Sequence, residues 1–125
     1  MTAHPVQSTF LVIGNDPMLS YLLNRYAEQS GCQMIQHISA PTVLEMRQLK
    51  PAAIIFSSLG HLHAAQSLVE ALAVHEILVL VCISVADEVR AREFGADACL
   101  FHPLTYDNFC ATLLAVNIPG KINPV

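Results

Sequence analysis

Charged side chains are scarce in this sequence. They make up 13% of its 125 residues, against roughly 25% in a typical soluble domain. The net charge is −4, and Lys50 and Lys121 are the only lysines. A chain without a basic patch has nothing to follow a phosphate backbone, so direct nucleic-acid binding is not expected.

Signals for export, for membrane insertion and for disulfide bonding are also missing. Residues 1–9 lack the cationic start and apolar core of a signal peptide, and no apolar run reaches the ~20 residues that span a bilayer. The cysteines are scattered, so we expect buried free thiols in a reducing compartment. The sequence therefore predicts a cytoplasmic protein without membrane contact. The cysteines are Cys32, Cys82, Cys99 and Cys110.

Hydrophobic residues are abundant and make up 54% of the chain. A content this high leaves two interpretations open. Either helices wrap an α/β core completely, or part of the apolar surface meets another subunit or a partner. The length fits one domain with a substantial core and is too short for two.

Segments with strand character alternate along the chain with segments of helical spacing. Short loops and right-handed crossovers then predict a parallel sheet with helices on both faces. The run 52–56 has no polar alternation, which predicts a strand buried on both sides, and 59–63 is expected to be a loop. The strands are expected at about 10–13, 34–38, 52–56, 77–83 and 99–101, and the helices at about 17–29, 42–49, 62–75, 87–95 and 105–116.

A hydroxyl group stands where an α/β protein often carries an acid. Ser57 directly follows the run 52–56, at the carboxyl end of an expected central strand. Open α/β sheets place their chemistry at this edge, where the loops after the first, third, fourth and fifth strands meet. A metal or phosphoryl site there would normally supply a carboxylate. This sequence supplies a serine instead.

Three stretches resemble the receiver domain of two-component response regulators, in the order and spacing of that family. They read FLVIGNDPMLSYLL, LKPAAIIFSS and REFGADACLFHPL, and the resemblance covers about residues 10–116. It implies a flavodoxin-like, doubly wound (βα)5 fold with a five-stranded parallel sheet in the order 2-1-3-4-5. Residues 1–9 are then a lead, and residues 117–125 a tail or a linker to an output domain.

The resemblance also places the phosphorylation pocket of that family on residues without its functional groups. The phosphorylated aspartate falls on Ser57, and the lysine before a proline falls on His102. The metal-binding acidic pair falls on Gly14 and Asn15, which leaves only Asp16 as a carboxylate. The expected degenerate pocket comprises Gly14, Asn15, Asp16, Ser57, Ser84 and His102, with the serine at 84 in place of the mobile hydroxyl of the family.

Such a pocket is not expected to support aspartyl phosphorylation. Mg²⁺ usually binds one or two carboxylates together with water and phosphate. A serine hydroxyl is not ionised at neutral pH, no general base is evident beside Ser57, and His102 is only partly charged. We therefore expect a pseudo-receiver: a phosphorylation-independent signalling module, neither an enzyme nor a cofactor carrier, that acts by protein–protein contact or as a homodimer.

The resemblance suggests which surface makes that contact. In receiver domains the surface of the fourth helix, the fifth strand and the fifth helix commonly mediates dimers and partner contacts. The switch aromatic of the fifth strand falls here on Cys99, and some residues of this surface must instead belong to the core. The possible interface comprises Val89, Arg90, Phe94, Cys99, Phe109 and Leu113.

A small-ligand or metal-binding regulatory domain is the alternative function. His61 and His63 follow the third strand and His102 follows the fifth, in loops that should converge near Asp16. Imidazoles with one carboxylate can hold zinc, nickel or iron. The spacing His-x-His carries little specificity, because most loop histidines are solvated or hydrogen-bonded.

An enzymatic site is a further alternative. Ser57 and His102 would form its nucleophile and base, yet the sequence has no Gly-x-Ser-x-Gly elbow and no evident acid to orient the histidine. Cys82 and Cys99 lie within expected strands, where buried thiols are usually inert. The residues therefore favour a binding module over a catalyst.

Overall fold

The apolar runs of the sequence form one parallel sheet in the computed structural model, which describes residues 8–116. The strands are β1 (Thr9–Ile13), β2 (Gln33–His37), β3 (Ala53–Phe56), β4 (Leu78–Ile83) and β5 (Ala98–Phe101). Their order is β2-β1-β3-β4-β5, and neighbouring strands are parallel. The expected flavodoxin-like, doubly wound topology is confirmed.

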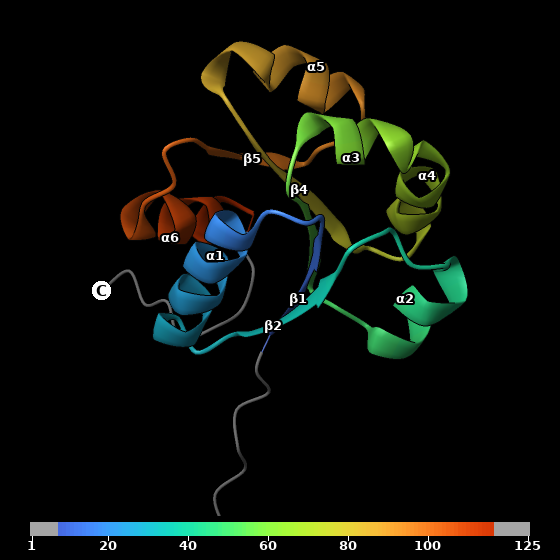
Figure 1. Ribbon diagram of the computed structural model, residues 1–125. Coiled ribbons are helices and arrows are strands. Elements are labelled where there is room, and N and C mark those ends of the chain that lie inside the picture. Colours follow the sequence, from blue (N-terminus) through green and yellow to red (C-terminus); the bar gives the residue numbers. More distant parts are fainter. Residues whose placement is uncertain (1–7, 117–125) are drawn as a thin grey trace, which may run out of the picture.

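Helices cover the sheet on both sides (Figure 1). They are α1 (Pro17–Gln29), α2 (Val43–Leu49), α3 (Leu59–Ala64), α4 (Gln66–Val74), the 3₁₀ turn η1 (Val85–Asp87), α5 (Glu88–Glu93) and α6 (Tyr106–Ala115). α1 and α6 pack on the face that carries Phe10 and Ile55, while α2 to α5 pack on the face that carries Leu11 and Phe56. Among residues 8–116, no helix has the length and apolar character needed to cross a bilayer.

β3 lies at the centre of the hydrophobic core. All four of its residues are fully buried, as expected for an apolar run without alternation. Ile54 and Phe56 pack under α2 to α5, whereas Ala53 and Ile55 pack under α1 and α6. Full burial of a large aliphatic or aromatic side chain stabilises the fold by about 1.5–3 kcal/mol. β3 therefore contributes to both helical layers, as its neighbours β1 and β4 also do.

The segment 59–63, expected to be a loop, is instead helical. Ser58 begins α3 as its N-cap, because its hydroxyl oxygen accepts the backbone N–H of His61 at 3.2 Å. The helix then starts at once after the strand, despite the glycine at position 60. The loop prediction was wrong because the glycine at position 60 suggested a turn, whereas the capping serine at position 58 starts a helix.

The apolar segment 62–75, expected to be one helix, is divided into α3 and α4 at Ala65. The side-chain amide of Gln66 donates to the carbonyl oxygen of Leu62 at 3.1 Å and to that of Phe94 at 2.9 Å. Both acceptors lie in the last turn or cap of a helix, where carbonyl groups need partners from outside the helix. The break is thus stabilised by a polar side chain that a hydrophobic pattern does not reveal.

Three residues of the expected interface belong to the core. Phe109 and Leu113 are fully buried on the inner side of α6, and Cys99 is 6% exposed. The ring of Phe109 meets that of Phe10 edge to face, with centroids 6.2 Å apart. The interface prediction was wrong for these three, because inward and outward apolar residues on one surface look alike in sequence.

We expect Phe109→Ala to lower the free energy of unfolding by about 3–5 kcal/mol, because it leaves a cavity in the core. Val89→Ala, at a side chain that is 72% exposed, should change it by less than about 0.5 kcal/mol. Urea unfolding followed by circular dichroism measures both, since the chain has no tryptophan to report by fluorescence. Equal losses in the two variants would contradict the burial of Phe109.

Candidate functional site

The pairing register brings the ends of β1 and β3 to the same level at the carboxyl edge of the sheet. Ile13 lies opposite Phe56, so the residues that follow them, Gly14 and Ser57, are neighbours. The backbone N–H of Ser57 donates to the carbonyl oxygen of Ile13 at 2.9 Å. Two residues of the expected pocket therefore lie side by side.

Gly14 and Ser57 are packed against each other without spare room. Gly14 has φ of +143°, and a Cβ atom added to it would overlap Ser57 Oγ and lie 2.6 Å from Ser57 Cβ. The backbone of Gly14 is held in place from β2, since its N–H donates to the carbonyl oxygen of His37 at 2.9 Å and its carbonyl accepts from Gln36 Nε2 at 3.3 Å. The serine side chain thus fills the space above the glycine.

An imidazole that the sequence analysis did not place beside Ser57 lies close to it. His61 Nδ1 is 2.7 Å from Ser58 Oγ and 3.4 Å from Ser57 Oγ. The expectation that no base stands beside Ser57 was therefore wrong, and the structure pairs this serine with His61 rather than with His102. The available signal was the spacing of three residues between Ser58 and His61, which is typical of an N-cap with its first helical turn.

Asp16, the remaining carboxylate of the expected pocket, is a helix cap. Its Oδ1 accepts the backbone N–H of Leu19 at 3.1 Å at the start of α1. Its charge also affects Cys82, whose thiol pKa is raised to about 12, chiefly by burial and further by Asp16. A thiol with so high a pKa stays protonated at neutral pH, in keeping with the expected inert cysteine.

Ser84 and His102 lie at the same edge, beyond β4 and β5. Ile83 pairs with Phe101 in the register, and the N–H of His102 donates to the carbonyl oxygen of Ile83 at 3.0 Å. The hydroxyl of Ser84 donates to Asp87 Oδ2 at 3.2 Å. The side chains of Ser84, His102 and Asn15 are all exposed, whereas Ser57 is buried.

Two of the three histidines of the metal-site alternative, His61 and His63, have other partners, and His102 is exposed. The ring of His63 stacks on Phe94 of the α5 cap, with centroids 4.5 Å apart and planes inclined by 20°. His61 faces the two serines, as described above. Across residues 8–116, no group of three or more His, Cys, Asp or Glu side chains is placed to hold a metal ion. The described part of the chain gives that alternative no support.

Comparison with known proteins rests on structure alone. No family model matches the sequence, and no curated protein matches it. A response regulator receiver protein from Burkholderia phymatum has a TM-score of 0.73 at 19% identity, over 95% of this chain and 100% of its own. A CheY-like protein (tadZ) from Pseudomonas aeruginosa PAO1 has a TM-score of 0.73 at 18% identity, over 88% of this chain and 99% of its own. This chain has the fold of a receiver domain.

A third solved structure with a similar fold is described as pilus assembly-related rather than as a response regulator. A putative pilus assembly-related protein from Burkholderia pseudomallei K96243 has a TM-score of 0.70 at 15% identity, over 92% of this chain and 94% of its own. In the receiver fold of the present chain, the carboxyl end of β3 is occupied by Ser57 and backed by Gly14. The resemblance inferred from sequence is confirmed at the level of the fold.

We expect Gly14→Ala to lower the free energy of unfolding by about 2–5 kcal/mol, because it combines an unfavourable φ with overlap on Ser57. Ser57→Gly in the same background should recover at least about 0.5 kcal/mol, as expected for residues in direct contact. Urea unfolding of the two single variants and the double variant measures this coupling.

Gly60→Ala is the matched control, because a Cβ at Gly60 would meet only Ser58 Oγ, at an ordinary 3.7 Å. In a helix this change should be neutral or stabilising by up to about 1 kcal/mol. A zero coupling energy between positions 14 and 57 would show that their side-chain space is not shared.

Proposed function

We propose that this chain is a pseudo-receiver: a signalling module of two-component type that works without phosphorylation and by contact with protein. The observation that carries the proposal is the Ser57–Gly14 packing at the carboxyl end of β3. By the resemblance, this is the place of the phosphorylated aspartate. A neutral hydroxyl that is packed against the next strand is a poor acceptor for a phosphoryl group.

The surrounding residues support the same proposal. Asp16 is engaged as the cap of α1, and Gly14 and Asn15 supply no carboxylate at the positions of the acidic pair. Mg²⁺ is held in proteins by hard oxygen ligands, usually including one or two carboxylates. His102 is exposed and lacks the permanent charge of a lysine. A receiver frame with these substitutions is suited to binding and not to group transfer.

The α5–β5–α6 side of the molecule is the proposed contact surface. Val85 and Val89 are 66% and 72% exposed, and Arg90 is exposed beside them. Phe94, also expected there, is partly buried under His63 and contributes less. β5 is an edge strand, so its outer side has no neighbouring strand within the sheet.

A shallow groove of about 270 Å³ runs along this side between α5, β5 and α6. Small side chains from β5 and α6 line much of it, so that another backbone can approach closely. The residues that line it are Arg92, Ala98, Cys99, Phe101, Asn108, Ala111, Thr112 and Ala115.

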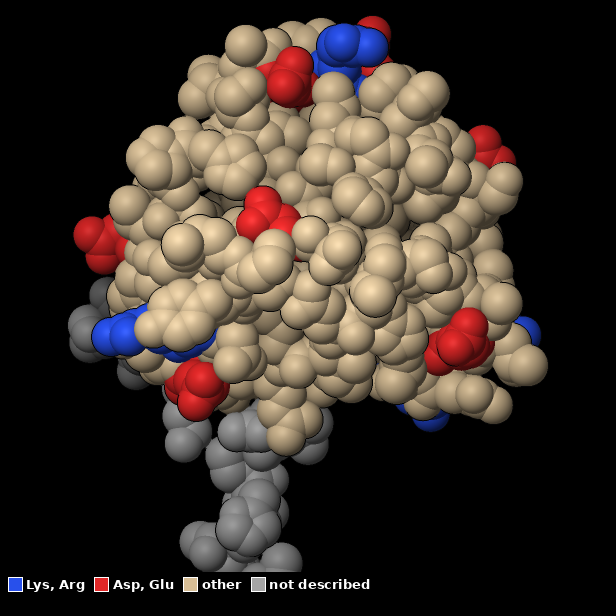
Figure 2. All heavy atoms as spheres, viewed as in Figure 1, with Lys and Arg blue, Asp and Glu red and all other residues tan. Residues whose placement is uncertain are grey.

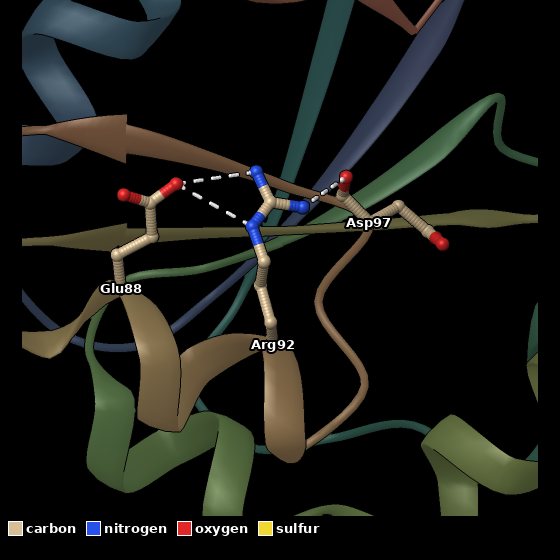
Figure 3. A network of polar contacts seen from close by, with 3 residues as sticks. All are labelled: Glu88, Arg92 and Asp97. Atoms are coloured by element: carbon tan, nitrogen blue, oxygen red, sulfur yellow. Dashed lines mark hydrogen bonds and ion pairs between the residues drawn. The ribbon is translucent and has the colours of Figure 1, made fainter.

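Arg92 links α5 to the start of β5 at the rim of this groove (Figure 3). Its Nε and Nη2 lie 3.4 Å from Glu88 Oε2, and its Nη1 donates to the backbone carbonyl oxygen of Asp97 at 3.2 Å. The groups are exposed, so the ion pair stabilises the fold by no more than about 1 kcal/mol. Its effect is to fix the orientation of α5, which carries Val89.

Charge distribution is compatible with protein contact. Figure 2 shows a face on which charged side chains are few and lie mostly near its margins, with a broad uncharged area between them. Such a surface does not attract polyanions, and its uncharged area leaves room for an apolar contact. The neighbour described as pilus assembly-related indicates that the same fold also occurs in a protein linked to an assembly process.

The amide NMR spectrum of the purified chain should not change at Ser57, Ser84 or His102 when Mg²⁺ and then beryllofluoride are added. The physical reason is the single carboxylate left in the pocket. A receiver domain that retains its aspartate serves as the positive control. Shifts centred on these three residues would contradict phosphorylation independence.

Val89→Arg should weaken self-association or partner binding by at least about tenfold, because it places a charge within an apolar contact. Val74→Arg is the matched control, since Val74 is 79% exposed at the end of another helix, α4. Sedimentation over a range of protein concentrations measures self-association. Equal behaviour of both variants would exclude the α5–β5–α6 side as the interface.

A further inference from the structure

A second cavity lies at the opposite, amino edge of the sheet, away from Ser57. It has a volume of about 430 Å³ and sits between the segments that lead into β3 and β4. Its apolar lining consists of Met46, Pro51 and Ile77, all of which are buried. A volume of this size is within the range of sites for small molecules.

The rim of this amino-edge cavity is mainly basic. Arg47, Lys50 and His75 line it together with one acidic residue, Glu76. Within residues 8–116, neither Arg47 nor Lys50 forms an ion pair or a side-chain hydrogen bond. Two cations of a chain with net charge −4 thus line one cavity, and neither forms an ion pair with Glu76 or with another acidic residue of the described chain.

Two other arginines of the described chain have partners, whereas the exposed Arg90, like Arg47, has none. Arg92 pairs with Glu88, and Arg25 Nη1 donates to the hydroxyl of Tyr21 at 3.2 Å. The position of Arg47 and Lys50 at the end of α2 favours positive charge, because it offsets the helix dipole. The helix dipole explains the positive charge at these two positions. It does not explain the apolar lining of the cavity, nor the presence of His75, which comes from the end of α4.

Two residues that line the cavity have a left-handed backbone conformation. Lys50 and Glu76 have φ of +48° and +58°, and they are the non-glycine residues with positive φ in residues 8–116. Both line the cavity, one from each of the two segments that form it. Lys50 is the C-cap of α2 and Glu76 follows the C-cap of α4, and a left-handed residue is common at the end of a helix. The two helix ends thus place both residues beside the cavity.

We propose that the amino-edge cavity binds a small organic anion. The apolar part of the ligand lies on Met46, Pro51 and Ile77, and its carboxylate or phosphate group lies between Arg47 and Lys50. A guanidinium group beside an ammonium group matches the geometry and charge of such a head group. The inference is independent of the proposed pseudo-receiver function, because no residue of the Ser57 edge takes part in it.

Hexanoate is the first probe, titrated into the full chain and followed by amide NMR. We expect shifts at the residues that line the amino-edge cavity and at least about tenfold weaker binding of hexanol or of inorganic phosphate, each of which supplies only half of the required chemistry. Hexyl phosphate, compared with hexanoate, then identifies the preferred head group.

Variants separate an anion site from a merely apolar cavity. The double variant Arg47→Gln/Lys50→Gln should raise the Kd of hexanoate about tenfold, and Glu76→Gln should lower it about threefold by removing the only acidic group on the rim. Arg25→Gln, which removes an arginine from α1, should leave the Kd unchanged.

Three results would overturn the proposal. The first is an absence of shifts at the lining residues with hexanoate. The second is equal binding of hexanoate with hexanol or with inorganic phosphate. The third is an unchanged Kd in the Arg47→Gln/Lys50→Gln variant, provided that its spectrum shows the native fold.

Discussion

Burial of β3 between two helical layers is the constraint on which the rest of this structure depends. Its four residues alternate between the layer of α1 and α6 and the layer of α2 to α5, and none of them reaches solvent. Its neighbours β1 and β4 must pair with it in a fixed register, because a slip of one residue would exchange the two apolar faces. The position of Ser57 follows from this register. Because the register of β3 is fixed on both sides, the residue that follows it has a fixed position at the carboxyl edge of the sheet.

At that point a receiver-like fold carries a serine that is packed against a glycine. The backbone of Gly14 is fixed by β2, and the space that it leaves is taken by the side chain of Ser57. The serine in turn lies near His61, which is turned towards Ser58 by the cap of α3. Asp16, Ser57 and Ser84 thus have hydrogen-bond partners within the fold, whereas Asn15 and His102 are exposed.

The fold was predictable from sequence to a greater extent than the site. The unbroken apolar run of β3 and the alternation of strand and helix segments predict the topology, because both depend on periodicity alone. The division of the apolar segment after Ser58 into α3 and α4 depends on Gln66 and on its distant acceptor at Phe94, and periodicity contains no such information. The same limit applies to Phe109 and Cys99, whose apolar character fits a core and an interface equally well. The place of Ser57 was predictable because it follows a strand directly. Its contact with Gly14 was not, because it joins two loops that are distant in sequence.

The amide of Gln66 and the ring of His63 have a mechanical consequence. Both attach to Phe94, the residue that ends α5, and both belong to the chain around the junction of α3 and α4. A force that pulls α5 outward must therefore either carry the α3–α4 junction along or break a hydrogen bond and an aromatic stack. Ser58, the residue after Ser57, caps α3, so these two contacts and one short helix connect the C-terminal end of α5 with the centre of the sheet edge. The contacts of Gln66 and His63 with Phe94 thus connect the helix next to the edge strand β5 with the helix that follows the central strand β3.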